Sequence, residues 1–310
     1  MSDFRILLTG GTGMVGRNLL EHPSLADLEV LAPSSQELNL CDFSSVLSYI
    51  ERHKPEMVIH CAGKVGGIQA NIRKPLEFLT DNLDMGRNIV LAARQKGVKR
   101  LINLGCSCMY PRNQSAPLCE EMVLKGELEP TNEGNALAKI VVARMCDYIR
   151  QEDESFKFKT LIPCNLYGHH DKFDPTHSHL IPSIIYKIHQ AMQCGHSNVE
   201  IWGDGTARRE FMYAGDLADV LVRAITHFDS LPNYMNIGLG HDHSVNDYYQ
   251  IAAQVMGYNG SFTHDTSKPV GMARKLVNIS RQLAWGWSSQ NDLFEGISKT
   301  YNFYRKENKL

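Results

Sequence analysis

Residues 5–16, RILLTGGTGMVG, join a short apolar run to a glycine-rich turn, and a helical pattern begins directly after the turn at Met14. Glycines at every third position allow a tight turn and let backbone N–H groups approach a pyrophosphate, which then lies at the N-terminus of the helix. An ordinary glycine-rich turn is the alternative, but the position between a buried strand and a helix favours a dinucleotide-binding loop. The glycines concerned are Gly10, Gly13 and Gly16.

The rest of the first half alternates apolar segments with amphipathic ones, which predicts strands and helices in turn. A repeated order of strand, helix and strand is typical of a parallel sheet with right-handed crossovers. We therefore expect an α/β fold, with a Rossmann-type doubly wound parallel sheet and a smaller mixed α/β lobe towards the C-terminus. The predicted strands are residues 5–9, 29–32, 57–61, 100–104 and 158–163. The first predicted helix begins at Met14, and the others cover residues 44–53, 82–96 and 131–150.

The second half of the chain lacks this regular alternation. A loop rich in histidine and proline, residues 168–182, precedes a predicted helix, a short strand at 200–202 and a helix at 216–227. We expect this part to lie over the carboxyl edge of the sheet, where open parallel sheets bind their ligands. The predicted division is a dinucleotide-binding domain, 1–165, completed by part of about 210–240, and a substrate-binding lobe, 166–310.

The composition is typical of a soluble globular protein. The 310 residues carry a formal net charge of −2, with 43% hydrophobic and 21% charged residues. This charge argues against a nucleic-acid or membrane-surface partner, and no apolar run reaches the ~18 residues that span a bilayer. The first residues leave no room for the apolar core of a signal peptide, so we expect a cytoplasmic location. The eight cysteines show no paired framework, so we expect most to be reduced and buried, and Cys106-x-Cys108 alone predicts no metal site.

The end of the second predicted strand usually distinguishes NAD from NADP, because a carboxylate there binds the ribose 2′-hydroxyl and a basic residue tolerates a 2′-phosphate. Residues 31–35, LAPSS, contain neither. The missing repulsion favours NADP (NADPH), with Ser34, Ser35 and Thr12 as candidate phosphate donors; the alternative is that the serines only form a turn. The complete predicted cofactor site is Gly10, Thr12, Gly13, Met14, Val15, Gly16, Ser34, Ser35, Asn39, Leu40, Ala62, Gly63, Lys139, Pro163, Asn165 and Leu166.

Short motifs spread over nearly the whole chain point to one family. They are HCAGKVGGI at 60–68, LGCSCMYP at 104–111, EPTNE at 129–133, NLYG at 165–168, SHLIP at 178–182, WG at 202–203, REF at 209–211, KP at 268–269 and RKL at 274–276. With these motifs the sequence resembles the GDP-L-fucose synthases and their relatives, including GDP-colitose synthases, among the extended short-chain dehydrogenase/reductases. The segments AGKVGGI and EPTNE make the resemblance specific, because they are not general to that superfamily.

The resemblance implies a reaction in two stages on a GDP-linked 4-keto-6-deoxy sugar. C3 and C5 are first epimerised, and NADPH then reduces the 4-ketone. Protons beside a ketone are acidic, so one base and one acid on opposite sides of the ring can invert a centre. The family uses a cysteine and a histidine for this step, which correspond here to Cys108 and His179. Without the resemblance, a packed thiol and a loop histidine would be the simpler interpretation.

The reductive stage departs from the family pattern. The family's Tyr-x-x-x-Lys pair and an upstream serine hold and protonate the oxyanion, and of these three residues the chain keeps only Lys139. Asn135 stands at the tyrosine position and Cys106 at the serine position. An amide has no usable proton near neutral pH, and general acid catalysis contributes about 10²- to 10⁴-fold. We therefore predict an epimerase whose 4-reduction is slow, unless Cys106, Ser107, Tyr110 or a water replaces the acid.

Three classes of function stay open on the sequence alone. An epimerase that binds NADP for a structural or electrostatic purpose is the leading prediction. A full epimerase and 4-reductase is the second, and a non-catalytic NADP-binding sensor is the third, although a sensor has no need of Cys108 and His179. Asn135 is either native, which the simultaneous Cys106 favours, or introduced to trap a complex.

Substrate contacts follow from the resemblance, which places cations for the diphosphate in the second lobe. Ordinary surface charges are the alternative for the two lysines. Asn165 follows a strand end, where sheet proteins place sugar contacts. The predicted substrate site is Asn165, His179, Lys187, Trp202, Arg209 and Lys268. We also expect a homodimer, paired through the helices that follow Asn82 and Thr131, whereas the exact sugar stays undetermined.

Overall fold

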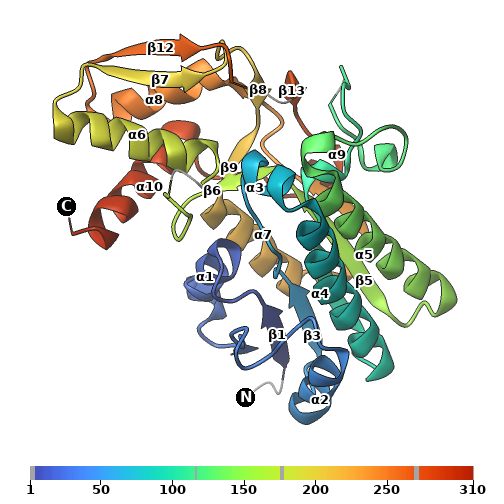
Figure 1. Ribbon diagram of the computed structural model, residues 1–310. Coiled ribbons are helices and arrows are strands. Elements are labelled where there is room, and N and C mark those ends of the chain that lie inside the picture. The colour runs from blue at the N-terminus through green and yellow to red at the C-terminus, as the bar shows by residue number, and fades with distance from the viewer. Residues whose placement is uncertain (1–3, 116, 175–177, 269–271, 310) are drawn as a thin grey trace.

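A parallel sheet forms the centre of the molecule. The computed structural model describes residues 4–115, 117–174, 178–268 and 272–309. Its six-stranded sheet has the order β10-β5-β4-β3-β1-β2, and every neighbouring pair is parallel (Figure 1). This confirms the predicted doubly wound α/β class. The strands are β1 (Arg5–Thr9), β2 (Glu29–Leu31), β3 (Met57–His60), β4 (Arg100–Leu104), β5 (Lys157–Pro163) and β10 (Tyr234–Ile237).

Helices cover both faces of the sheet, because alternate side chains of each strand point to opposite faces. In β1, Leu7 packs into one apolar cluster with side chains of α2, α4 and α5, whereas Ile6 and Leu8 pack into another with side chains of α1 and α7. The inner strands are therefore buried on both sides, as their continuous apolar runs predicted. The helices are α1 (Met14–Leu20), α2 (Phe43–His53), α3 (Ile68–Arg73), α4 (Pro75–Gln95), α5 (Glu133–Glu152) and α7 (Ala214–Thr226).

Helix α4 begins earlier than the sequence pattern predicted. The prediction covered residues 82–96, but the helix runs over Pro75–Gln95. Pro75 occupies the first helical position, where its fixed φ suits the helix and its missing N–H has no helical partner to lose. Asn82 consequently lies inside a continuous helix, where its side chain is buried.

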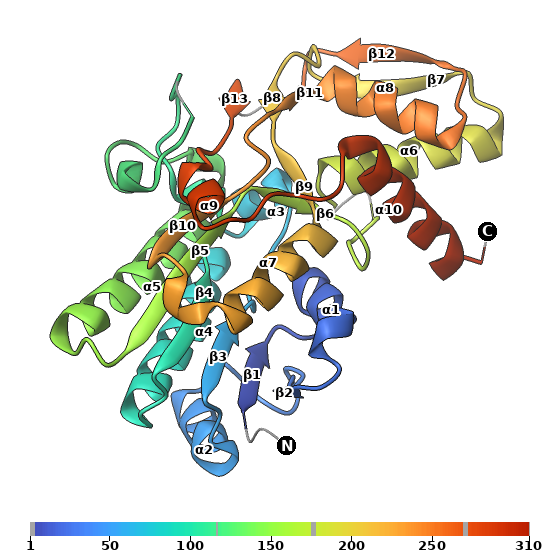
Figure 2. The same ribbon diagram turned by 180° about the vertical axis from the view of Figure 1, so that it is seen from behind.

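The second lobe lies beyond the carboxyl ends of the sheet strands (Figures 1 and 2). Helices α6, α8 and α10 share an apolar cluster with the parallel pair β7 and β12, while β6 pairs with β9, and β8 with β11 and β13. Residues 175–177 of the predicted loop and Pro269 of the KP motif fall outside the described residues. The remaining elements are α6 (Leu180–Cys194), α8 (Val245–Met256), α9 (Ser280–Ala284), α10 (Leu293–Glu307), β6 (Asn165–Tyr167), β7 (Asn198–Trp202), β8 (Arg208–Arg209), β9 (Phe211–Tyr213), β11 (His243–Ser244), β12 (Ser261–Asp265) and β13 (Arg274–Lys275).

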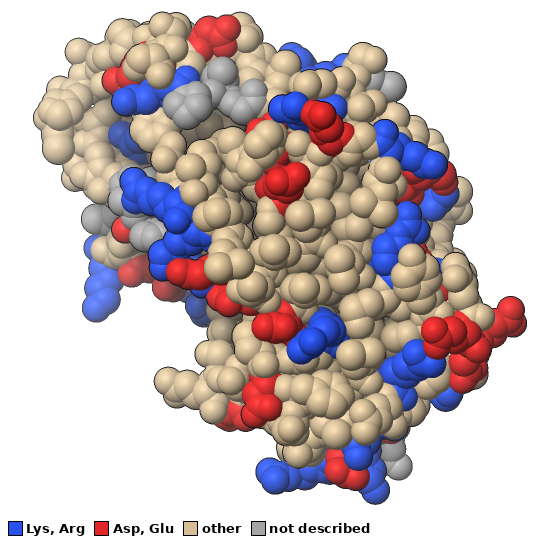
Figure 3. All heavy atoms as spheres, turned by 45° about the vertical axis from the view of Figure 1, so that its right-hand side comes forward, with Lys and Arg blue, Asp and Glu red and all other residues tan. Residues whose placement is uncertain are grey.

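Surface charge is mixed. On the face drawn in Figure 3, basic and acidic side chains are interspersed among uncharged ones. The formal net charge of −2 agrees with this mixture. Within the described part of the chain, no helix combines the length and the apolar character needed to cross a membrane.

Candidate active site

The glycine-rich loop lies where the strand order reverses, between β1 and β3. Gly10 has a φ of +76°, a conformation that favours glycine. A Cβ on Gly10 would lie 2.7 Å from the backbone N of Ala62, and a Cβ on Gly16 would lie 2.2 Å from the carbonyl O of Gly10. Both glycines are therefore needed for the close packing of this loop and the segment after β3. Open parallel sheets bind their ligands at such a reversal.

A cleft of about 690 Å³ opens at this edge of the sheet. The glycine loop, the ends of β4 and β5, the start of α5 and the segment before α6 all contribute to its walls. All of the predicted cofactor residues line it except Ser34, whose backbone N–H donates to Oε2 of Glu37 at 2.8 Å. Of the three candidate phosphate donors, Thr12 and Ser35 are thus the two that the cleft contains.

Four residues that line the cleft carry a buried polar atom without a hydrogen-bond partner among the described residues. Buried polar atoms are usually paired, so this set indicates a polar ligand. Burial also raises the pKa of Asp171 to about 7, so this carboxyl group takes up a proton near neutral pH. Together with the open cradle at the glycines, these groups fit a large polar cofactor and substrate. The atoms are Oδ1 of Asn71, Oδ1 of Asn132, Nδ1 of His170 and Oδ2 of Asp171.

Both residues predicted to epimerise the sugar line the cleft. Cys108 is buried in the short 3₁₀ helix η2 (Ser107–Met109), which follows β4. His179 is the N-cap of α6 and comes from the second lobe. Burial, and to a lesser extent the charge of Lys172, lower the pKa of His179, so its imidazole is neutral at pH 7 and can accept a proton. The structure thus brings the two residues predicted to transfer protons from separate lobes to one cleft.

The sulfur of Cys108 is bonded to that of Cys106. Cys106 is extended and Cys108 lies in the 3₁₀ helix, so their Cα atoms are 5.3 Å apart, within the range that a disulfide needs. This pair is an exception to our expectation that most cysteines are reduced. A bonded Cys108 has no thiol, so the disulfide must be reduced before this residue can move a proton. The free cysteines are Cys41, Cys61, Cys119, Cys146, Cys164 and Cys194.

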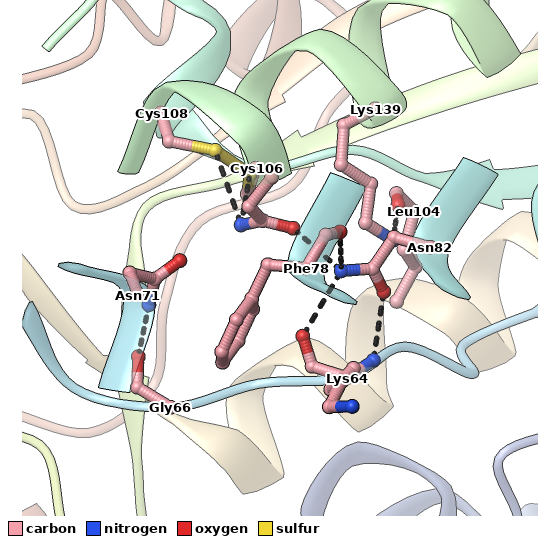
Figure 4. Close-up of a disulfide and its surroundings, with 10 residues drawn as sticks. Lys64, Gly66, Asn71, Phe78, Asn82, Leu104, Cys106, Cys108 and Lys139 are labelled. Atoms are coloured by element: carbon pink, nitrogen blue, oxygen red, sulfur yellow. Dashed lines mark hydrogen bonds between the residues drawn. A yellow bond between two sulfur atoms is a disulfide. The ribbon is translucent and has the colours of Figure 1, made fainter. Parts of the chain in front are cut away.

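Lys139 and Asn135 lie close to this cysteine pair. Figure 4 shows the cysteine pair of the segment after β4 and Lys139 of α5 lying in one region. The Nζ of Lys139 donates to the carbonyl O of Leu104 at 2.9 Å, and burial lowers the pKa of Lys139 to about 8. The Nδ2 of Asn135 donates to Sγ of Cys108 at 3.6 Å. Asn135, at the position where the resemblance leads us to expect a tyrosine, thus contacts the cysteine pair.

The candidate residues that could replace the missing general acid differ in whether they reach the cleft. Cys106 and Ser107 line the cleft, whereas Tyr110 does not. Tyr110 is buried, and its hydroxyl donates to Oδ1 of Asn236 at 2.5 Å. Burial also raises the pKa of Tyr110 far above its usual value. Tyr110 is therefore not placed to protonate a sugar in the cleft.

Two of the predicted substrate residues line the cleft, and four lie outside its walls. Lys187 and Lys268 place their Nζ atoms 5.1 and 5.7 Å from the centre of the Trp202 ring, so these three side chains form one group in the second lobe. Arg209 lies apart from them in β8. The two residues within the cleft are Asn165 and His179.

Lys275 is a cleft residue that the sequence analysis missed. It is paired in register with Arg209 across β13 and β8, and burial, with Arg209, lowers its pKa to about 8. The RKL motif at 274–276 was the available signal, but the prediction used Lys268 instead. The cleft residue Asp171 was missed as well, and so was Asn82, which contacts the cleft residue Asn135, because a lone loop carboxylate and an amide inside a helix belong to no motif.

The glycine cradle at a strand reversal, with proton-transfer groups in the same cleft, defines a dinucleotide-binding α/β protein equipped for proton chemistry. The chain belongs to the NAD dependent epimerase/dehydratase family, whose model matches residues 6–238. It is 51% identical over 303 residues to a GDP-L-colitose synthase of Yersinia pseudotuberculosis, covering 98% of each chain. It is 48% identical over 306 residues to a GDP-L-fucose synthase of Azorhizobium caulinodans, covering 99% of this chain and 98% of that protein.

A solved structure gives the same comparison in three dimensions. The chain is similar to MlghC, a GDP-mannoheptose C4 reductase from Campylobacter jejuni with NADP bound, with a TM-score of 0.89 and 28% identity. The match covers 98% of this chain and 99% of that one. The family resemblance inferred from the motifs is thereby confirmed.

Proposed function

We propose that the chain is a GDP-sugar epimerase of the GDP-L-fucose synthase type, which binds NADP and acts on a GDP-linked 4-keto-6-deoxy sugar. The observation that carries this proposal is that a single cleft is lined both by the glycine loop and by Cys108 and His179. Support also comes from two relatives, similar over nearly the whole chain, that are GDP-L-colitose and GDP-L-fucose synthases.

Epimerisation requires the removal of a proton beside the ketone and its return from the other side. The neutral imidazole of His179 accepts the proton beside the ketone as the base, and the reduced thiol of Cys108 returns a proton from the other side as the acid. They belong to different lobes, which lets them approach the sugar ring from different sides. Asn135 and the ammonium group of Lys139 hold the ketone oxygen as negative charge develops on it.

NADP fits the glycine cradle. The backbone of Gly10–Gly16 would hold the pyrophosphate, Thr12 and Ser35 the 2′-phosphate, and Lys139 the nicotinamide ribose. When bound in its reduced form, the cofactor supplies a hydride donor. We further propose that residues 1–165, with part of about 210–240, hold the cofactor, and that residues 166–310 hold the sugar nucleotide.

The reductive stage is slow in this proposal because the amide of Asn135 has no proton to give up near neutral pH. A full epimerase and 4-reductase is the second candidate, and the names of the two synthases and of the C4 reductase favour it. In that case the reduced thiol of Cys106, which lines the cleft, is the residue placed to act as the acid.

GDP and NADPH are each expected to raise the midpoint of thermal unfolding. A ligand that binds only the folded state, at 100 times its Kd, adds about 2.7 kcal/mol to the free energy of unfolding. Arg209 is paired in register with the cleft residue Lys275, so Arg209→Ala should remove most of the gain from GDP and keep the gain from NADPH, whereas Lys157→Ala, at the far end of β5, should keep both. A chain that NADPH stabilises and GDP does not would be a sensor rather than this enzyme.

Protein prepared without a reductant is expected to be inactive, because Cys108 is then held in its disulfide with Cys106. Dithiothreitol restores both thiols by giving up two electrons and two protons, and itself becomes a cyclic disulfide. Cys106→Ser leaves Cys108 without this partner, so that variant should epimerise the sugar without reductant. The comparison is the initial rate of solvent-deuterium exchange in each protein with and without dithiothreitol. An equal need for reductant in both proteins would contradict the role given to Cys106.

We also propose a homodimer that is paired through the outer faces of α4 and α5. These helices lie side by side (Figure 1), and their exposed apolar residues include Leu91 on α4 and Leu137, Val141 and Tyr148 on α5. A second copy would cover this surface. Val141→Glu should give a monomer by light scattering, whereas Leu283→Glu, on α9 and at least as exposed, should not. An unchanged mass for Val141→Glu would place the interface elsewhere.

A further inference from the structure

A chain of amides connects helix α4 to the cysteine pair (Figure 4). The backbone N–H of Lys64 donates to Oδ1 of Asn82 at 2.7 Å, which fixes which end of that amide is the acceptor. The Nδ2 of Asn82 lies 2.8 Å from the carbonyl O of Phe78 and 3.1 Å from that of Lys64. The same Nδ2 lies 3.1 Å from Oδ1 of Asn135. The two N–H bonds of Asn82 face three acceptors, so one of them is shared, and the amide is held in one orientation with its NH₂ group towards Asn135.

The orientation of Asn135 follows from this contact. Because its Oδ1 accepts from Asn82, its NH₂ group must point the other way. The Nδ2 of Asn135 lies 3.6 Å from Sγ of Cys108 and 4.0 Å from Sγ of Cys106. An amide of this kind donates and bears no charge, so it favours an anion in front of it without itself titrating.

We propose that Asn135 is a positioning residue for the Cys108 thiolate, and that Asn82 sets the direction of its amide. This inference rests on the proposed function, in which reduced Cys108 moves the proton of the sugar. A hydrogen bond to the charged form of a group stabilises that form, so the donor increases the thiolate fraction at neutral pH. It also holds the sulfur in one place beside the substrate. The replacement of tyrosine by asparagine thus serves the first stage of the reaction rather than merely removing the second.

Other charges near Cys108 stay constant when Asn135 is changed. Helix α5 packs against η2 and contributes Lys139, whose Nζ binds the carbonyl O of Leu104, and Glu133 in its first turn. The other charged or titratable side chains that line the cleft are also left unchanged; they are Cys41, Cys61, Cys164, His170, Asp171, Lys172, His179 and Lys275. A shift in thiol titration between variants at position 135 therefore reports the amide itself.

The test is the pH dependence of Cys108 alkylation in a Cys106→Ser background, where no disulfide with residue 106 can form. Iodoacetamide reacts with the thiolate, so the rate of Cys108 carbamidomethylation, followed by peptide mass between pH 5 and pH 10, gives the apparent pKa of the thiol. Asn135→Leu, similar in size but without a donor, should raise this apparent pKa by about one unit. Asn135→Gln, which keeps an amide, should raise the apparent pKa by less than Asn135→Leu does.

Controls separate this inference from the function on which it rests. Asn71→Ala removes another amide of the same cleft, one that donates to Gly66 and Gly67, and it should leave the alkylation profile of Cys108 unchanged. The readout needs no sugar, so a raised pKa in Asn135→Leu, together with a Cys106→Ser parent that does not epimerise the sugar, would sustain the amide contact and reject the proposed function. Identical alkylation profiles for Asn135→Leu and its parent would overturn the inference, even if the parent epimerises the sugar.

Discussion

Asn135→Tyr combined with Cys106→Ser is expected to raise the rate of 4-keto reduction by about 10²- to 10⁴-fold. The tyrosine would supply the general acid that an amide lacks. Lys139 follows four residues later on the same face of α5, so its ammonium group would lower the pKa of the new phenol. Position 135 lines the cleft, which places the phenol where the sugar binds in our proposal. The measurement is NADPH consumption with GDP-4-keto-6-deoxy-mannose.

The control for this gain is Asn135→Phe with Cys106→Ser, which has the same ring without the hydroxyl. It should reduce the ketone no faster than the unaltered chain, because a ring alone donates no proton. A double variant with tyrosine that binds NADPH and GDP but still fails to gain reductase activity would contradict the prediction. The missing acid would then not be what limits reduction.

Cys108→Ala is expected to lower the rate of proton exchange at the sugar by about 10²- to 10⁴-fold. Alanine fills much of the same buried volume but cannot take or return a proton. Exchange is measured as deuterium uptake into the GDP-4-keto sugar, with the protein fully reduced. The gain in thermal stability from NADPH should persist, because the glycine loop and Lys139 are untouched.

Cys194→Ala is the matched control for this loss. Cys194 is a free, exposed thiol at the end of α6 and does not line the cleft, so its removal should leave exchange at the level of the unaltered chain. His179→Gln, which keeps a polar side chain at the N-cap of α6, should lose exchange as Cys108→Ala does. Exchange that survives in both Cys108→Ala and His179→Gln would mean that other groups move the proton.

The parts of the fold that depend on local pattern were predictable from the sequence. The glycine loop and the strand at Arg5–Thr9 are found where they were expected, because steric demands at Gly10 and Gly16 and the burial of β1 on both faces restrict the residue types allowed. Most other boundaries differ by a few residues at most. The start of α4 was wrong by a larger margin, since a first turn with mixed polar residues carries little helical periodicity.

The site was predictable only where a motif marks it. Cys108 and His179 lie within family motifs, and Lys139 stands at the lysine position of the family's Tyr-x-x-x-Lys pair. All three residues line the cleft. The amide chain through Asn82 depends on two helices packing side by side, which no local pattern specifies. Likewise, Trp202 with its two lysines lies outside the cleft because the position of the second lobe over the sheet is set by long-range contacts.

The most direct test of the proposed epimerase is the fate of GDP-4-keto-6-deoxy-mannose in D₂O, with NADPH and the fully reduced protein. Product mass and NMR would follow the sugar while absorbance follows the cofactor. We expect deuterium at C3 or C5 with the 4-ketone intact and with almost no NADPH consumed. A C4-reduced sugar that forms as fast as deuterium enters would contradict the slow reductive stage. The absence of deuterium, with NADPH and GDP both bound, would contradict the assignment of proton transfer to this cleft.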